Sequence, residues 1–341
     1  LVAAVACGDS GQPEEEPTAA PASSPSLLSD APESASVAEA PPPSTDEVVS
    51  VTATSEPEPD EVVAEAPARE FTEPIRGGVF RRLWSDPPTL DPHLTSDTTS
   101  AGIVVEVFSG LVTLNTNLQL VPDLAESWTI DDGLVYTFKL RPNARIHNGK
   151  PVTARDFKWS LERAADPKTA SPVAGTYLND IVGALDYIEG SASEISGIKV
   201  IDDRTLRITI DAPKAYFLAK LTYPTAFVLD RETVEAGGLS WWVDNPVGTG
   251  AFKLAEYRIG ERVVLERNDD SYREPALLDS IVMNLAGGQA MAMYENDEID
   301  ITGVGLFDLD RVLDPTEPLN KELVIAPPGF SVSYIGFNTT K

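Results

Sequence analysis

The sequence predicts an α/β or α+β fold with mixed sheets from residue 77 onward, on three observations. Apolar residues alternate with polar ones in short stretches, as in 135–141 (VYTFKLR), which predicts half-buried strands. Apolar residues recur at helical spacing elsewhere, as in 100–109, which predicts amphipathic helices. Strand and helix patterns intermix to the end of the chain, which favours mixed sheets over an all-helical or all-strand fold.

The other elements follow from the same patterns, in chain order. A capping box, Thr153 followed by Asp156, predicts the start of a helix whose inward face holds Phe157 and Leu161. A hairpin is predicted where two apolar runs flank 202–205 (DDRT). Further strands are expected at 77–84, 198–201, 206–210, 263–267 and 281–285, and a further helix at 289–296.

Residues 8–74 differ in composition from everything after them. They hold 12 of the 28 prolines, and their 16 Asp and Glu against one Arg give −15 of the chain's net charge of −28. Such a segment buries too little apolar surface to offset the entropy of ordering. We therefore expect a disordered acidic linker, extended by proline and by charge repulsion.

Composition also excludes several classes of protein. A pI near 4.3 argues against a nucleic-acid partner. One cysteine excludes a disulfide framework, and two distant histidines, His93 and His147, offer little for a metal site. No apolar run has the length of a membrane-spanning helix. Nucleophile-elbow, phosphate-loop and zinc-protease motifs are absent from the sequence, so we expect no enzyme, no cofactor and no metal.

The first seven residues (LVAAVAC) resemble the end of a bacterial lipoprotein export signal. Small residues precede Cys7, as in a lipobox, and the acidic linker follows it directly. We expect residues 1–7 to be a signal-peptide remnant, with Cys7 lipidated and the linker tethering the folded part to the membrane. A free cysteine at a frayed terminus is the alternative.

Nine phrases resemble a single family when they are taken together and in order. They are 89–92 (TLDP), 108–112 (FSGLV), 121–128 (VPDLAESW), 136–142 (YTFKLRP), 147–157 (HNGKPVTARDF), 246–252 (PVGTGAF), 265–268 (LERN), 297–300 (DEID) and 337–339 (FNT). This order is similar to that of the family 5 extracellular solute-binding proteins, the oligopeptide- and dipeptide-binding subunits of ABC importers. The resemblance runs from about residue 77 to the last residue.

Several of these phrases also have a purely structural explanation. Gly248 and Gly250 are expected to supply a turn that needs positive φ. Trp128 is expected to pack against a core. The acidic pair Asp131-Asp132 lies in a turn context, where it needs no catalytic role. The phrases therefore identify a fold more firmly than they identify ligand contacts.

The resemblance implies a two-lobed periplasmic-binding-protein type II fold with mixed sheets, in which the ligand lies between the lobes. Lobe one, with its insertion subdomain, would span 75–275. Residues 276–341 would begin lobe two, which would be incomplete because family members are longer, so that the chain would be a truncated fragment.

The function implied is the capture of oligopeptides or dipeptides outside the cytoplasmic membrane, in the periplasm or at the cell surface. The protein would act as a lipid-anchored monomer and deliver its ligand to the permease subunits of an ABC transporter. The alternative is the same fold binding a nickel chelate, an oligosaccharide or an opine.

The resemblance also places the ligand contacts. Ser96, Asp97 and Thr98, just after Leu-Asp-Pro, would lend main-chain groups to an extended peptide. Val173 stands where the family has a tyrosine that lines the cleft, so an aromatic contact is absent at that position. Tyr334 either reaches the cleft or packs in the core, and both interpretations remain open.

Overall fold

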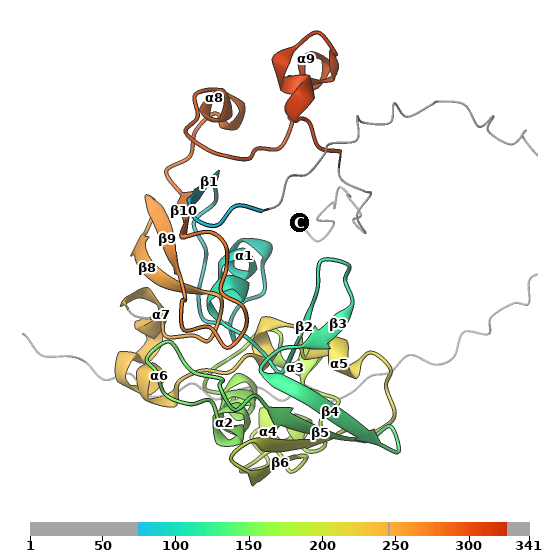
Figure 1. Ribbon diagram of the computed structural model, residues 1–341. Helices are drawn as coiled ribbons and strands as arrows, with labels where there is room; N and C mark the ends of the chain where they lie inside the picture. Colours follow the sequence, from blue (N-terminus) through green and yellow to red (C-terminus); the bar gives the residue numbers. More distant parts are fainter. Residues whose placement is uncertain (1–73, 245, 326–341) are drawn as a thin grey trace, which may run out of the picture. The chain divides into compact units, whose positions relative to one another are not determined.

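The computed structural model describes residues 74–244 and 246–325, and these form a mixed α/β fold (Figure 1). Residues 1–73, which include Cys7 and nearly all of the acidic segment, lie outside the described residues, as does Tyr334. In the described part of the chain, no helix is long and apolar enough to cross a membrane.

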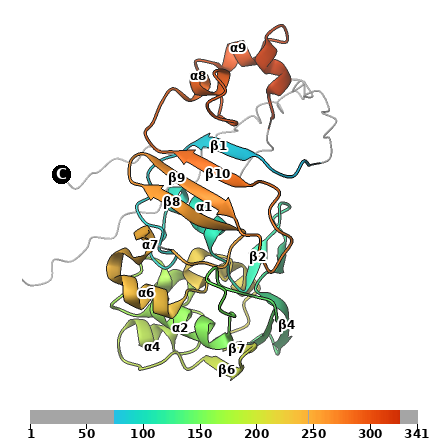
Figure 2. The same cartoon turned by 60° about the vertical axis from the view of Figure 1, so that its left-hand side comes forward.

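One four-stranded sheet joins the first strand of the described chain to three strands that follow residue 250. Its order is β1-β10-β9-β8, formed by β1 (Val79–Leu83), β10 (Ser280–Asn284), β9 (Arg262–Arg267) and β8 (Phe252–Arg258). β1 runs parallel to β10, whereas the other pairs are antiparallel, so the sheet is mixed as predicted. Figure 2 shows the four strands side by side.

A second four-stranded sheet is antiparallel throughout. Its order is β4-β5-β7-β6, formed by β4 (Ala125–Asp131), β5 (Val135–Leu140), β7 (Thr205–Thr209) and β6 (Ile198–Asp202). The hairpin predicted around 202–205 is confirmed, because β6 and β7 pair across this turn. A smaller antiparallel pair is formed by β2 (Val112–Leu114) and β3 (Leu120–Pro122).

The helices are short apart from two. These two are α1 (Thr98–Val107) and α2 (Ala154–Ala165). The others are α3 (Ala174–Tyr177), α4 (Ala184–Ile188), α5 (Phe217–Lys220), α6 (Arg231–Gly237), α7 (Trp241–Asp244), α8 (Ala290–Glu295) and α9 (Leu309–Leu313), with 3-10 turns η1 (Pro224–Ala226), η2 (Gly238–Ser240) and η3 (Pro318–Glu322). The predicted capping box is confirmed at α2: Thr153 Oγ1 accepts from the Asp156 N–H, and the Asp156 carboxylate accepts from the Thr153 N–H.

Two hydrophobic cores form within the described residues. In the first, Phe157 and Leu161 of α2 pack against the β4-β5-β7-β6 sheet through residues such as Phe138. In the second, Val104 of α1 and its neighbours pack against the β1-β10-β9-β8 sheet through residues such as Val263. The region expected to be one lobe with an insertion subdomain therefore contains two separately packed layers of sheet and helix.

The chain after residue 276 continues the second core. β10 hydrogen-bonds to both β1 and β9, and Ile281 and Met283 on it are buried. Further along, the Asp300 N–H donates to the Arg81 carbonyl (2.8 Å), and the Asp300 carboxylate pairs with the Arg81 guanidinium (2.7 Å). β10 and Asp300 are thus both held to the sheet that contains β1.

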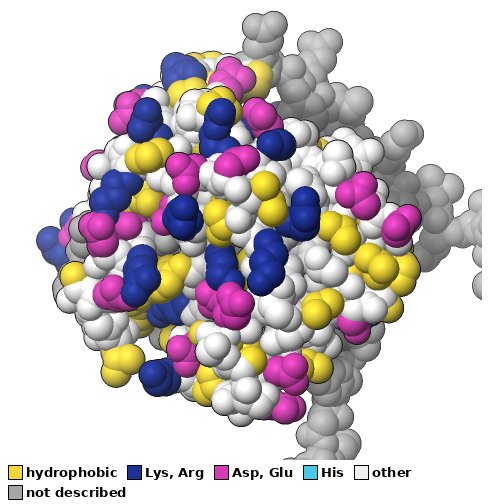
Figure 3. Space-filling view, turned by 90° about the horizontal axis from the view of Figure 1, so that it is seen from below, with side chains coloured by type: hydrophobic (Ala, Val, Ile, Leu, Met, Phe, Trp, Pro, Cys, Tyr) yellow, Lys and Arg dark blue, Asp and Glu magenta, His cyan; other side chains and the backbone are white. Residues whose placement is uncertain are grey.

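The surface mixes charges of both signs although the chain is acidic overall. Figure 3, which looks at the end that carries β6 and α4 in Figure 1, shows Lys and Arg interspersed with Asp and Glu. On α2, Lys158 pairs with Glu162 (2.9 Å) and with Glu194 (2.9 Å). Such partly exposed pairs contribute little stability singly, and on the face that Figure 3 shows the two signs alternate.

The expectation that Gly248 and Gly250 supply a turn with positive φ is wrong. Neither has positive φ. Instead the chain here lies against the end of α1, and a Cβ built on Gly248 would lie 1.9 Å from the Val107 carbonyl oxygen, and one on Gly250 2.2 Å from that of Glu106. Glycine is required at both positions because the main chain here approaches the main chain of α1 too closely for a side chain. A sequence pattern does not distinguish this requirement from a requirement for positive φ.

Replacing Gly248 by alanine should therefore destabilise the fold strongly. We expect Gly248→Ala to lower the free energy of unfolding by several kcal/mol, about the upper end of what single substitutions cost, because backbone cannot move aside as a side chain can. Urea unfolding followed by circular dichroism measures this. Gly175→Ala is the matched control, since a Cβ there meets nothing within 4 Å and φ is not positive. Equal effects of the two substitutions would contradict the explanation.

Candidate functional site

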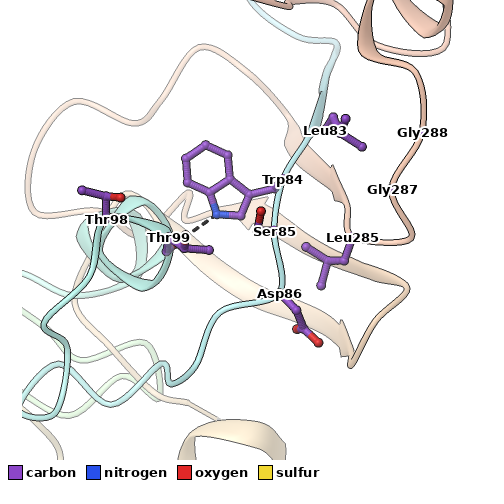
Figure 4. Close-up of a pocket in the computed structure, with 9 residues that line it drawn as sticks. All are labelled: Leu83, Trp84, Ser85, Asp86, Thr98, Thr99, Leu285, Gly287 and Gly288. Carbon is purple, nitrogen blue, oxygen red and sulfur yellow. Dashed lines mark hydrogen bonds between the residues drawn. The ribbon is translucent and has the colours of Figure 1, made fainter. Parts of the chain in front are cut away.

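The candidate site is a hollow of about 540 Å³ where β1 and β10 end and α1 begins (Figure 4). Because β1 and β10 are parallel, their carboxyl ends lie at one edge of the sheet, where α/β proteins commonly bind ligands. The lining residues come from these three places: Leu83, Trp84, Ser85, Asp86, Thr98, Thr99, Leu285, Gly287 and Gly288. The lining is therefore mixed, with apolar side chains beside hydroxyls, a carboxylate and main chain.

Trp84 is held in place from three sides. Its indole Nε1 donates to the Thr99 carbonyl (3.0 Å), as the dashed line in Figure 4 marks, and the Arg82 guanidinium lies 3.9 Å from the centre of its ring. A Cβ on Gly102 would lie 2.6 Å from Trp84 Cζ2, so the helix can approach the ring only because residue 102 is glycine. The tryptophan thus forms a fixed wall of the hollow.

Asp86 ties the hollow to the turn between β8 and β9. Its carboxylate accepts from the Tyr257 hydroxyl (2.8 Å) and from the Gly260 N–H (2.9 Å). Burial, and then the bond to Asp86, raise the pKa of Tyr257 far above its ordinary value, so the phenol stays a neutral donor. Two of the carboxylate's lone pairs are thereby occupied within the protein.

The loop that leads to α1 is fixed by a buried polar network. Arg163 of α2 donates to both carboxylate oxygens of Asp91 (2.6 and 3.1 Å), and the Trp241 indole donates to the same carboxylate (3.0 Å). His93 bridges the network to the main chain, with Nε2 at 3.1 Å from the Phe227 carbonyl and Nδ1 at 2.9 Å from Arg163 Nη1. Because a carbonyl only accepts and a guanidinium only donates, His93 must be neutral with its proton on Nε2.

His147 has the same kind of arrangement. Its Nε2 donates to the Gly250 carbonyl (3.1 Å), and its Nδ1 accepts from the Gly248 N–H (3.2 Å). Burial is the main reason that the pKa of each histidine falls from 6.5 to about 4. Both histidines therefore hold main chain in position and are not poised to bind a metal. Among the residues that the structure describes, no group of three or more His, Cys, Asp or Glu could hold a metal ion.

Acid should weaken the fold through these two histidines. The unfolded chain takes up a proton near pH 6.5, whereas the folded chain does so only near pH 4. Stability from this source is thus complete above pH 6.5 and is lost as pH falls toward 4, by roughly 3 kcal/mol for each histidine. Urea midpoints of the wild type between pH 7 and pH 4 should show this loss.

The control is the double variant His93→Gln/His147→Gln, which keeps a donor and an acceptor at each position but does not titrate. Glu106 and Asp123, whose pKa values burial raises, act in the opposite direction and are present in both proteins. The difference between wild type and variant therefore reports the two histidines together with Asp91, whose pKa His93 helps to lower. The same pH slope in both proteins would contradict the assignment.

The residues proposed for main-chain contacts lie at the edge of the hollow. Asp97 has extended backbone (φ −126°, ψ 159°) and precedes α1, and its carboxylate accepts from the Ser100 N–H (2.8 Å) as the helix cap. Thr98 is the first helical residue and lines the hollow, and both it and Ser96 are exposed. Within the described residues, no acceptor lies within hydrogen-bond range of the N–H of Ser96, Asp97 or Thr98.

Val173 does not reach the hollow, but its helix is connected to the same loop. It is half-buried at the start of α3, and its carbonyl accepts from the Tyr177 N–H (3.1 Å). The Tyr177 ring stacks on Tyr223, whose hydroxyl donates to the Thr95 carbonyl (3.4 Å). Through Tyr223, α3 is therefore connected to Thr95, the residue before Ser96.

Sequence reasoning did not select Trp84 or Asp86 as site residues. The available signal was an aromatic residue at the predicted end of a strand, followed by Ser-Asp-Pro-Pro, which breaks the strand. Nothing in the spacing says that this strand end meets that of β10, nearly 200 residues later in the chain.

Comparison with known proteins gives the family. Residues 119–341 match the family described as "Bacterial extracellular solute-binding proteins, family 5 Middle". The chain belongs to this family. The family predicted from the nine phrases and the mixed α/β fold are therefore confirmed. This is a family of solute-binding proteins and not of enzymes, as expected.

The relatives are named as binders of peptides or of a bile acid. The chain is 35% identical over 265 residues to the probable deoxycholate-binding periplasmic protein YgiS of Escherichia coli, an alignment that covers 75% of this chain and 49% of the relative. It is 34% identical over 231 residues to the periplasmic oligopeptide-binding protein OppA of the same organism, covering 66% and 42%.

Solved structures agree with this family at the level of the fold. The E. coli murein tripeptide binding protein MppA matches with a TM-score of 0.66 at 29% identity, covering 72% of this chain and 49% of that one. Haemophilus influenzae OppA in complex with RPPGFSPFR matches with a TM-score of 0.64 at 30% identity, covering 71% and 48%. The chain spans about half the length of these relatives.

Proposed function

We propose that this chain belongs to the substrate-binding component of an ABC importer, which captures oligopeptides or dipeptides outside the cytoplasmic membrane and delivers them to permease subunits. Membership of solute-binding family 5 supports the general role. The observation that carries the peptide assignment is the run of three main-chain N–H groups at 96–98, which have no partner in the described part of the chain.

The geometry of this run suits a peptide. Asp97 is extended and separates the open N–H groups of Ser96 and Thr98, so an extended ligand can pair with main chain here whatever its side chains are. The adjoining hollow has room for a side chain between Trp84 and Leu285. Main-chain pairing gives affinity for many sequences, and the hollow adds selectivity.

A bile acid or another non-peptide solute is the second candidate, because the relative at 35% identity is named as deoxycholate-binding. Such a ligand has one carboxylate and a rigid apolar ring system. It would occupy the apolar wall of Leu83, Trp84 and Leu285 and would make less use of successive main-chain N–H groups.

The proposal extends to the organisation of the whole chain. Residues 8–74 would be a flexible acidic linker between a lipidated Cys7 and the folded part, in the periplasm or at the cell surface. Lobe one would hold both cores, the second of which includes Ile281 and Met283 of β10 as well as residues of 75–275. Because β10 belongs to the sheet of β1, we place the passage to lobe two after it, at Gly287 and Gly288. The folded part would act as a monomer.

The test is to remove one main-chain N–H without disturbing the fold. Thr98 is the first residue of α1, where proline is favoured, and Asp97 before it has the extended backbone that proline requires. We expect Thr98→Pro to weaken binding of tri- to pentapeptides roughly tenfold, since one hydrogen bond to a ligand is worth about 0.5–1.5 kcal/mol and the ring adds steric cost.

Thr98→Ala is the matched control, since it keeps the N–H and loses only the side-chain hydroxyl and methyl, and it should bind nearly as the wild type does. Isothermal titration measures both variants against a peptide pool and, separately, against deoxycholate. Equal affinity of the two variants for peptides would contradict main-chain recognition at this segment. Binding of deoxycholate with no binding of peptides would favour the second candidate.

A further inference from the structure

Two stacked tyrosines lie beside the proposed peptide-binding segment. The rings of Tyr177, at the end of α3, and Tyr223, after α5, have centroids 3.8 Å apart and planes inclined by only 12°. The Tyr223 hydroxyl donates to the carbonyl of Thr95, the residue immediately before Ser96 (3.4 Å). The pair therefore has a fixed position next to the unpaired N–H groups of 96–98.

Both tyrosine residues are half-buried, so each keeps part of its surface open to solvent. Burial, and then the neighbouring Tyr177, raise the pKa of Tyr223, which keeps the phenol neutral. A near-parallel pair of phenols anchored at one end presents a flat, rigid surface of low conformational entropy, and such surfaces favour flat apolar groups.

The charges around the pair do not favour an acidic ligand group. Asp180, close to Tyr177 in sequence, is buried and paired with Lys214 (2.6 Å) and Lys220 (2.7 Å). Lys214 also pairs with Asp211 (2.8 Å), so two lysines are matched by two carboxylates. The Asp97 carboxylate is engaged with the N–H of Ser100 at the start of α1. With both lysines already paired and the Asp97 carboxylate nearby, an uncharged aromatic side chain fits this surface better than an acidic one.

We propose that Tyr177 and Tyr223 form a specificity wall that favours peptides with an aromatic side chain at the residue paired with 96–98. This inference rests on the proposed peptide-binding function and adds to it the class of side chain selected. The wall is separate from the hollow, because neither tyrosine lines it.

The test compares four peptides: tri-alanine, and the three variants of it that carry one phenylalanine at the first, second or third position. Binding to the 341-residue chain is measured by saturation-transfer NMR titration, which detects weak ligands. We expect one phenylalanine position to bind roughly threefold to tenfold more tightly than tri-alanine, as expected for one aromatic stacking contact.

Three variants make the measurement decisive. Tyr177→Ala should remove the preference for phenylalanine over tri-alanine, whereas Tyr177→Phe should retain the preference because it keeps the ring. Tyr216→Ala is the matched control, since Tyr216 is an exposed tyrosine beside Lys220 on the same stretch of chain, and it should behave as the wild type does.

A preference that survives in Tyr177→Ala, or that never appears in the wild type, would overturn the inference while leaving peptide binding intact. Failure of the wild type to bind any of the four peptides would instead contradict the proposed function on which the inference rests.

Discussion

The buried ion pair between Asp91 and Arg163 is the interaction on which the geometry of the site depends. Its Asp91 side chain is 2% exposed and its Arg163 side chain 16% exposed. Burial opposes ionisation of Asp91, but the bonds from Arg163 and the neighbouring charges hold the pKa of the carboxyl below its usual range. A charge so placed must stay paired, because removal of one partner of a buried pair costs about 3–5 kcal/mol.

The pair also joins parts of the chain that belong to different cores. Arg163 comes from α2 in the first core, and Trp241, which donates to the same carboxylate, belongs to the second. Asp91 and His93 lie on the loop that runs from β1 to α1. The position of residues 96–98 therefore follows from contacts that both cores make with this loop, and the extended backbone at Asp97 is set before any ligand arrives.

The sequence predicted local features well because they depend on neighbouring residues. The capping box at Thr153, the hairpin around 202–205 and most strands follow from spacing within about ten residues. The chemistry of the site was less accessible, since Trp84 and Leu285 meet only when β1 pairs with β10. The same limit explains Gly248: the pattern indicated that glycine was required, whereas its reason, the approach to α1, is a contact across the fold.

Family resemblance supplied what spacing could not, since it singled out 96–98 before any geometry was known. It also drew attention to Val173, whereas the aromatic surface on this side of the loop is formed one helical turn later by Tyr177 together with Tyr223.

Amide hydrogen exchange of Ser96, Asp97 and Thr98, followed by NMR with and without a peptide pool, tests the central claim most directly. These N–H groups have no acceptor in the described part of the chain, so they should exchange fast in the free protein. The account predicts that bound peptide slows their exchange while that of the Ser191 N–H, which donates to the Asp186 carbonyl on α4, stays unchanged. Peptide binding that leaves the exchange of 96–98 unaltered would contradict it.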